Sequence, residues 1–302
     1  MSKTAANFRH RIGNAQDLQS VVRTMKSMAA SSIEQYENSV RSLNDYYRAI
    51  ELGLGVCLRA VESTHPENGF EDPLELDVTG VIVFGSDQGL VGQFNDRVAE
   101  LTIETLRKLP GKPSVWAVGE RVHTRLAEGG LPIESIFEVP NSVSGITALI
   151  GEIQRATEPV FRAPQARILA FHNRPLAGAA YTSSSRQLLP LDNSWRQELC
   201  DTTWPGIALP ELLADLDDTL QALIGEYLFI SLYQACAESL ASENASRLAA
   251  MERADRNIAE MLETLRLRFN RERQQSIDEE LFDLISGFEA LSQMESGDDA
   301  SG

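Results

Sequence analysis

Apolar and small residues recur every three or four positions along the first sixty residues, apart from one gap filled by Leu18 or Gln19, and no proline interrupts them. This spacing keeps the stripe on one face of a helix and is typical of a coiled-coil seam. A helix over residues 4–58 would be about 80 Å long at 1.5 Å per residue, longer than a small domain is wide. The stripe therefore needs a second long element to cover it. Its members are Phe8, Ile12, Ala15, Val22, Met25, Ala29, Ile33, Tyr36, Val40, Leu43, Tyr47, Ile50 and Leu54.

The last third of the chain repeats this pattern. From Leu213 to Phe269 mostly apolar residues again step by three or four positions, with one wider step from Met251 to Ile258, and no proline follows Pro210. Two helices that each carry one stripe are best buried against one another, and a domain between them favours an antiparallel pair. The sequence therefore predicts a coiled coil of an N-terminal helix over 1–62 and a C-terminal helix over 210–291, with a disordered tail over 292–302.

The middle of the chain, residues 76–208, alternates between two other patterns. Short β-branched runs predict strands over 78–84, 114–118, 133–139, 166–172 and 181–191. Helical patterns lie between the first four of them, over 97–109, 120–128 and 146–157. Strands that alternate with helices form βαβ units, so we expect a Rossmann-like α/β domain with a mainly parallel sheet.

The charge balance excludes some classes of partner. The chain has 44 Asp and Glu against 27 Lys and Arg, a net charge of −17, whereas nucleic acid needs a basic surface. No stretch reaches the about 20 apolar residues that a membrane span needs, and the N-terminus lacks the apolar core of a signal peptide. The three cysteines are far apart in the sequence, which suits reduced thiols. We expect a soluble, acidic, cytosolic protein without nucleic-acid binding or direct membrane insertion.

A glycine-rich segment, Gly85–Gly92, follows the first predicted strand, where loops that bind phosphate are found. It lacks the Gly-Lys-Ser/Thr ending of a Walker loop, and its glycine spacing is not that of the dinucleotide fingerprint. We therefore favour a structural turn. The alternative is a stand-alone α/β enzyme that binds a phosphorylated ligand at this loop.

No catalytic or metal-binding motif is evident. The four histidines share no ligand spacing, and none has a cysteine two to five residues away. The Gly-x-Ser-x-Gly motif of serine hydrolases is absent. We therefore expect no catalytic residue, no cofactor and no metal.

Basic residues gather near the N-terminus. The first thirty residues contain five basic residues and a single acidic one, Asp17, and the basic residues flank the apolar stripe. Such a cluster in an acidic chain suggests a surface for a partner. Its members are Lys3, Arg9, Arg11, Arg23 and Lys26.

Three regions of the chain resemble one family. Residues 241–251 and 270–287 are similar to the C-terminal signature of the gamma subunit of F-type ATP synthases. Residues 8–12 and 25–31 look like the N-terminal helix of that family, and 86–95 resembles its central glycine-rich motif. The regions occur in the family's order and span nearly the whole chain.

Several positions depart from the family's usual residues. Gln88 and Val91 stand where arginine and cysteine are usual, and Asp278 stands where threonine is usual. Ser32 and Glu34 lie in a stretch where lysines are common. These departures suggest a divergent branch, such as the alternate ATPases that some bacteria carry beside their standard enzyme.

The resemblance implies an architecture and a set of partners. The two terminal helices would form a shaft inside a ring of alternating alpha and beta subunits. The α/β domain would form a foot that binds the epsilon subunit and the membrane rotor ring of c subunits. Such a subunit is non-catalytic. It couples ATP synthesis or hydrolysis to proton or sodium translocation, at the cytoplasmic face of the cell membrane.

The resemblance also implies contact residues. Arg273 and Gln274 match an arginine-glutamine pair that touches a loop of the catalytic beta subunit, and Met25 and Lys26 would contribute from the opposite helix. Arg9, Arg11 and Arg23 are candidates for an additional interface. Beside the stand-alone enzyme, a coiled-coil scaffold that dimerises through its helices is a third alternative.

Overall fold

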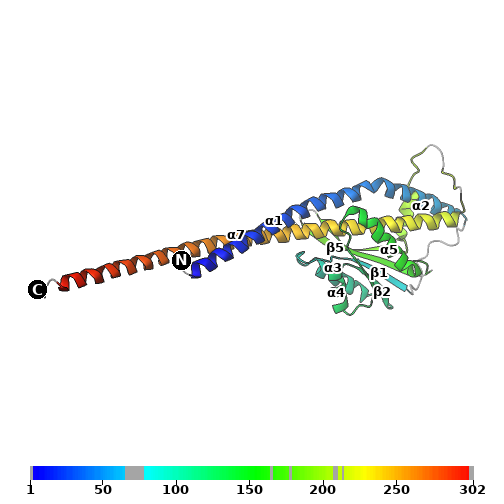
Figure 1. Ribbon diagram of the computed structural model, residues 1–302. Coiled ribbons are helices and arrows are strands. Elements are labelled where there is room, and N and C mark those ends of the chain that lie inside the picture. Colours follow the sequence, from blue (N-terminus) through cyan, green and yellow to red (C-terminus); the bar gives the residue numbers. More distant parts are fainter. Residues whose placement is uncertain are drawn as a thin grey trace. The chain divides into compact units, whose positions relative to one another are not determined.

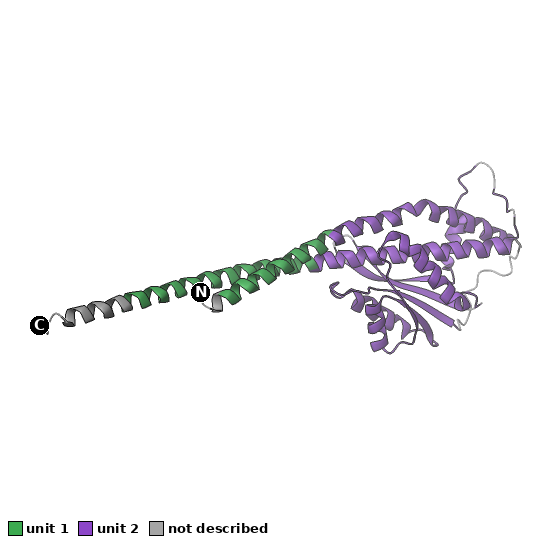
Figure 2. Ribbon diagram, in the orientation of Figure 1, with its two compact units in different colours: residues 1–27, 251–302 green, residues 28–250 purple. Residues whose placement is uncertain are grey.

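The structure of the chain, a computed structural model, describes residues 3–64, 78–163, 166–176, 179–206, 210–212 and 214–298. These residues form two compact units, one of residues 1–27 with 251–302 and the other of residues 28–250 (Figure 2). Two helices, α1 (Lys3–Ser42) and α7 (Leu216–Asp298), contribute to both units (Figure 1). The predicted tail, 292–302, lies partly outside the described residues, and its described part belongs to α7. The boundaries predicted for the domains stay a prediction.

In the first unit α1 and α7 pack against each other through their apolar stripes. The buried residues are Ala15 and Val22 of α1, and Met251, Ile258, Leu262 and Leu265 of α7. Arg23 lies against Asp255, whereas Lys26, further along α1, lies against the earlier residue Glu252. The two helices are therefore antiparallel, as the sequence predicts.

In the second unit α7 is packed against the rest of α1 and against α2 (Asn44–Thr64). The Tyr46 hydroxyl donates a hydrogen bond to Glu226 at 2.7 Å, and the rings of Tyr47 and Tyr227 lie 6.4 Å apart. Ile50 and Leu54 of α2 are buried in the same apolar core as Tyr227. The stripe predicted for the N-terminal helix thus lies against α7 in this unit as well.

The predicted N-terminal helix is divided in two at Leu43. The Ser39 hydroxyl donates a hydrogen bond to the Tyr36 carbonyl at 2.7 Å. The Ser42 hydroxyl donates one to the Ser39 carbonyl at 2.8 Å. The Ser39 carbonyl therefore accepts from a hydroxyl, and the Leu43 amide bonds to Val40 instead. Competition between serine hydroxyls and the helix backbone is a known cause of bends and explains the break between α1 and α2.

The described residues in the middle of the chain form a five-stranded sheet in the order β3-β2-β1-β4-β5. Its strands are β1 (Val78–Phe84), β2 (Pro113–Val118), β3 (Ile133–Phe137), β4 (Ala166–Leu176) and β5 (Ala179–Leu189). The first four are parallel, and only β5 runs antiparallel to its neighbour. This confirms the prediction of a Rossmann-like α/β domain with a mainly parallel sheet.

Each face of the sheet has its own apolar core because successive strand residues point to opposite faces. Val81 and Val83 face α3 (Phe94–Leu106) and α4 (Glu120–Glu128). Ile82 and Phe84 face the other side, where α5 (Val143–Phe161) and α7 cover the sheet (Figure 1). The long helix α7 is thus part of the core of the α/β domain.

The helix α6 (Asn193–Asp201) lies where the sequence pattern predicts none. Its first turn is capped by Asp192, which accepts hydrogen bonds from the amides of Ser194 and Trp195 at 2.9 and 3.1 Å. A helix this short depends on its cap and on burial of Leu199 and Cys200, and it carries little periodic signal in the sequence.

A buried polar contact joins the sheet to α7. His172 of β4 is hydrogen-bonded through Nε2 to Glu238 Oε2 at 2.9 Å, and Gln234 donates to the other oxygen of this carboxylate at 2.8 Å. Burial raises the pKa of Glu238, but the interactions with His172, the hydrogen bond from Gln234 and the charge of Arg186 together outweigh it and hold the pKa below its ordinary value. His172 therefore stabilises Glu238 in its ionised form.

We predict that His172→Leu lowers the free energy of unfolding by about 1–3 kcal/mol, since it leaves a mostly buried carboxylate without one of its donors. Urea denaturation at neutral pH measures the loss. The double variant His172→Leu with Glu238→Leu should recover much of it, because two apolar side chains can fill the site. An equal or larger loss in the double variant would contradict this explanation.

Candidate functional site

Arg273 and Gln274, the predicted contacts to the beta subunit, both lie exposed on α7. Among the described residues neither side chain has a hydrogen bond or an ion pair. Arginine is a planar, permanently charged donor, and glutamine both donates and accepts. The pair is therefore free to bind a polar loop of another protein.

Two of the predicted contacts on α1, Lys26 and Arg23, are bound within the chain instead. Lys26 Nζ lies 3.7 Å from Glu252 Oε1, and Arg23 Nε lies 3.3 Å from Asp255 Oδ1. Met25, between them, is half-buried. Arg9 and Arg11, nearer to the N-terminus, are exposed. Part of the basic cluster thus serves contacts between helices.

The structure does not bring the two predicted contact pairs together. Lys26 lies against Glu252, and Arg273 follows 21 residues later on α7, about 30 Å along the helix at 1.5 Å per residue. The two predicted pairs therefore lie at separate levels along the helices.

A row of exposed apolar residues near the end of α7 is absent from the predicted site. These residues are Ile277, Leu281, Phe282, Leu284 and Ile285, and Leu284 is 74% exposed. Four of them recur at the spacing of one helical face, the signal by which the sequence could have marked them. Large apolar side chains gathered in water indicate a surface that another protein covers.

A second exposed apolar row lies on α1. Leu18 and Val21 are each more than half exposed and lie two turns and one turn before the half-buried Met25. They share one side of the helix next to the buried seam. This row would extend any contact that Met25 makes.

The glycine-rich loop after β1 is tied into the domain by its own side chains. The Asp87 carboxylate accepts hydrogen bonds from the amide of Glu120, the first residue of α4, at 2.9 Å and from the amide of Val139 at 2.8 Å. The Ser86 amide donates to Asn95 Oδ1 at 3.0 Å. The anion at the start of α4 is thus supplied by the protein, which favours a structural turn over a phosphate site.

Close packing explains two glycines at this loop. A Cβ on Gly85 would lie 2.3 Å from Cβ of Val122, and one on Gly119 would lie 2.8 Å from the Ser86 backbone. Gly119 also has φ of 109°, a conformation that other residues rarely adopt. These glycines allow β1, the loop and α4 to approach one another, a structural requirement that needs no ligand.

The same loop is bonded to α7. Ser246 donates a hydrogen bond to the Val91 carbonyl at 2.5 Å, and both residues are buried. One turn away, Arg247 pairs with the buried Glu243 at 2.5 Å. Burial raises the pKa of Glu243, and the charge of Arg247 opposes this shift. The loop therefore fastens the α/β domain to the long helix.

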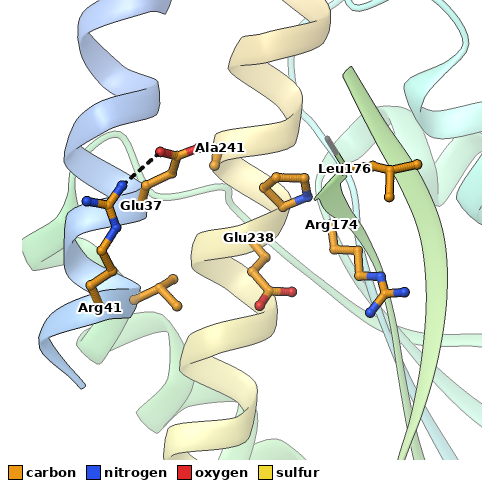
Figure 3. Close-up of a pocket in the computed structure, with 8 residues that line it drawn as sticks. Glu37, Arg41, Arg174, Leu176, Glu238 and Ala241 are labelled. Carbon is orange, nitrogen blue, oxygen red and sulfur yellow. Dashed lines mark hydrogen bonds and ion pairs between the residues drawn. The ribbon is translucent and has the colours of Figure 1, made fainter. Parts of the chain in front are cut away.

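A groove of about 520 Å³ lies between α1, α7 and the end of β4 (Figure 3). In the figure Arg41 points to Glu37, to which it donates a hydrogen bond at 3.3 Å, and Arg174 turns away from that pair. Cations and carboxylates are mixed around it, so the groove does not have the uniform charge of a nucleotide site. Its lining residues are Glu37, Val40, Arg41, Arg174, Pro175, Leu176, Glu238 and Ala241.

In the part of the chain that the structure describes, no three His, Cys, Asp or Glu side chains gather in a way that could hold a metal ion. None of the helices in that part is both long and apolar enough to cross a membrane.

Comparisons with known proteins agree on one family. A family model described as ATP synthase matches residues 4–291. The ATP synthase gamma chain of a Nitratiruptor species is 27% identical over 300 residues, covering 94% of this chain and 98% of that one. The gamma chain of Legionella pneumophila (strain Corby) is 27% identical over 295 residues, covering 95% and 99%.

Solved structures share the fold. A chain of the mitochondrial ATP synthase central stalk and c-ring of Tetrahymena thermophila superposes with a TM-score of 0.55 at 20% identity, covering 78% of this chain and 99% of that chain. A chain of the Euglena gracilis mitochondrial enzyme has a TM-score of 0.58 at 16% identity, covering 95% and 94%. With a family model that matches nearly every residue and relatives that align from end to end, the chain belongs to the ATP synthase gamma chain family.

Proposed function

We propose that the paired helices of this gamma chain are the central rotating shaft of a rotary ATP synthase, and that its α/β domain is the foot of the shaft. The observation that carries the proposal is α7, one helix of 83 residues that pairs with α1 and also closes the core of the α/β domain. A force applied to the foot therefore acts on the helix directly. A gamma chain is a non-catalytic subunit, so its task is to transmit force between other subunits.

An asymmetric shaft can drive chemically identical sites into different states. At each angle it presents a different surface to each catalytic subunit of the surrounding alpha and beta ring, and so favours a different conformation there. Binding energy at the ring and the angle of the shaft are then coupled in both directions. This is how the chain would link ATP synthesis or hydrolysis to proton or sodium translocation.

Arg273 and Gln274 are the proposed polar contacts to the beta subunit. Both are exposed and have no partner among the described side chains of this gamma chain. A hydrogen bond with one charged partner contributes about 1.5–3 kcal/mol, strong enough to favour an angle and weak enough to break in each cycle. Met25 and Lys26 form the second proposed contact, at another level, with Arg9, Arg11 and Arg23 as additional interface residues.

The exposed apolar end of α7 fits a partner surface of the ring. Phe282 is 69% and Leu284 is 74% exposed, and burial of each would contribute about 1.5–3 kcal/mol. Apolar contacts carry no directional hydrogen bonds. They can centre a rotating helix without fixing its angle, which leaves the angle to the polar contacts.

The foot is the proposed site for the epsilon subunit and for the ring of c subunits. Leu90 supports a contact there, because it is 63% exposed and has φ of 64°, a strained conformation for a large apolar residue. The similar solved structures are those of a central stalk with a c-ring from Tetrahymena thermophila and of a rotor from Euglena gracilis. By this proposal the chain is peripheral to the membrane, at its cytoplasmic face.

The chain's unusual residues support a divergent branch of the family. Gln88 and Asp278 are exposed, where they are free to alter contacts without altering the fold. Val91 is buried and packs as an apolar residue at the place of the usual cysteine. We propose that the chain serves an alternate bacterial ATPase, whose ring has matching changes.

The competing function, a stand-alone enzyme with a phosphate site at Gly85–Gly92, leads to a different result in a simple experiment. We predict that the purified chain does not bind ATP at micromolar concentrations, since Asp87 already occupies the start of α4 with a negative charge. Isothermal titration calorimetry measures the affinity. Micromolar binding that Asp87→Asn alters would favour the enzyme.

Loss of the polar contact should uncouple the complex without dissolving it. We predict that Arg273→Ala with Gln274→Ala lowers ATP-driven ion pumping by about tenfold or more, the effect of losing one charged hydrogen bond. ATP hydrolysis and assembly should persist, and pumping is measured in reconstituted vesicles. Arg256→Ala, at another exposed arginine of α7, is the matched control and should leave pumping unchanged. Unchanged pumping in the double variant would mean that the contact lies elsewhere.

Apolar residues at the end of α7 should matter only in the complex. We predict that Phe282→Ser with Leu284→Ser leaves the thermal unfolding midpoint of the isolated chain unchanged, because both side chains are already in water. Affinity for the alpha and beta ring should fall by at least about tenfold, the effect of about 1.4 kcal/mol. Surface plasmon resonance with the purified ring measures it. Leu265→Ser, at a buried position, should instead destabilise the isolated chain.

A further inference from the structure

Asp255 of α7 is hydrogen-bonded to two residues of α1 in the unit of residues 1–27 and 251–302. Its Oδ1 atom accepts a hydrogen bond from Gln19 Nε2 at 3.0 Å and another from Arg23 Nε at 3.3 Å. One turn earlier on α7, Glu252 forms an ion pair with Lys26. Among the described residues of this unit, these are the side-chain hydrogen bonds and ion pairs that join the two helices.

The apolar seam by itself locates α1 only loosely in this unit. The residues that α1 buries there, Ala15 and Val22, are smaller than Met251, Ile258, Leu262 and Leu265, which α7 buries, while Leu18 and Val21 of α1 are exposed. Small side chains make shallow knobs, and shallow knobs resist sliding and rotation weakly. Another interaction is needed to select one position of α1 on α7.

Asp255 supplies that selection through its geometry. Gln19 and Arg23 are one helical turn apart, and a single carboxylate oxygen accepts from both. A shift of α1 by one turn would replace one of these donors by Ala15 or Ser27. The Asp255 side chain is 24% exposed against 64% for Arg23, so the acceptor is the better shielded of the two partners.

We propose that Asp255 is a positioning residue, which fixes the register and the rotation of α1 on α7. It thereby determines the direction in which α1 presents Met25. In the sequence Met25 lies between Arg23 and Lys26, the two residues of α1 that form ion pairs with α7. The importance of this direction rests on the proposed contact of Met25 with the catalytic ring. The register itself is a property of the chain alone.

Pulsed EPR on the full chain tests the register. Spin labels are placed at Gln16→Cys on α1 and Glu263→Cys on α7, both exposed, while the three native cysteines are buried. We expect one narrow distance distribution, and its loss in Asp255→Ala. Asp255→Glu should retain the narrow distribution, and the reciprocal exchange of Arg23→Asp with Asp255→Arg should restore it. Glu260→Gln removes an exposed charge nearby without a cross-helix contact and is the matched control.

A narrow and unshifted distribution in Asp255→Ala would overturn the proposal. Circular dichroism reports whether the variant is folded. If it is not, Gln19→Leu with Arg23→Leu, which removes both donors and leaves Asp255 in place, decides by the same measurement. Ion pumping by the assembled complex tests the role of Met25 separately from the register. A broad distribution with unchanged pumping would leave Asp255 as the register residue and overturn the role of Met25.

Discussion

Burial of one apolar stripe on each of α1 and α7 is the interaction on which the rest of this structure depends. Neither helix can hide its stripe alone, and each is too long for a small domain to cover. In the unit of residues 28–250, α7 also completes the apolar core of the α/β domain. The α7 residues in this core are Leu228, Leu232 and Ala235, and they share it with Ile168 and Ala170 of the sheet. One helix is thus shared by a helix pair and by an α/β domain.

The polar groups of the chain fall into two sets with different roles. Asp87, Glu238 and Asp255 bind partners within the chain, where they hold a loop, a strand and a helix in place. Arg273 and Gln274 are bound to no described residue, and the apolar end of α7 lies in water. A protein that transmits force needs both sets, since internal bonds keep its shape and free groups reach its partners.

Features that repeat along the sequence could be predicted well. The stripes of both helices and the alternation of strands and helices are periodic, and β1 and α4 have the predicted bounds. The break at Leu43 was not predictable from periodicity, because it results from two serine hydroxyls that compete for backbone carbonyls. The same holds for α6, which depends on one capping aspartate.

The candidate site was less predictable because it depends on how two helices are aligned. The sequence marks Arg23 and Lys26 as cations beside an apolar stripe, but their pairing with Asp255 and Glu252 follows from the register. The residues Arg273 and Gln274 came from resemblance to a family and not from a physical pattern. The apolar end of α7 has a pattern that could have been read, since four of its residues share one helical face.

The central claim is that this chain is a single shaft inside a ring, and the composition of the native complex tests it most directly. Native mass spectrometry of the complex purified from its own host gives the number of copies of each subunit. We expect one copy of this chain for every three copies of a nucleotide-binding partner. Equal numbers of the two, or a homodimer of this chain without such a partner, would contradict it.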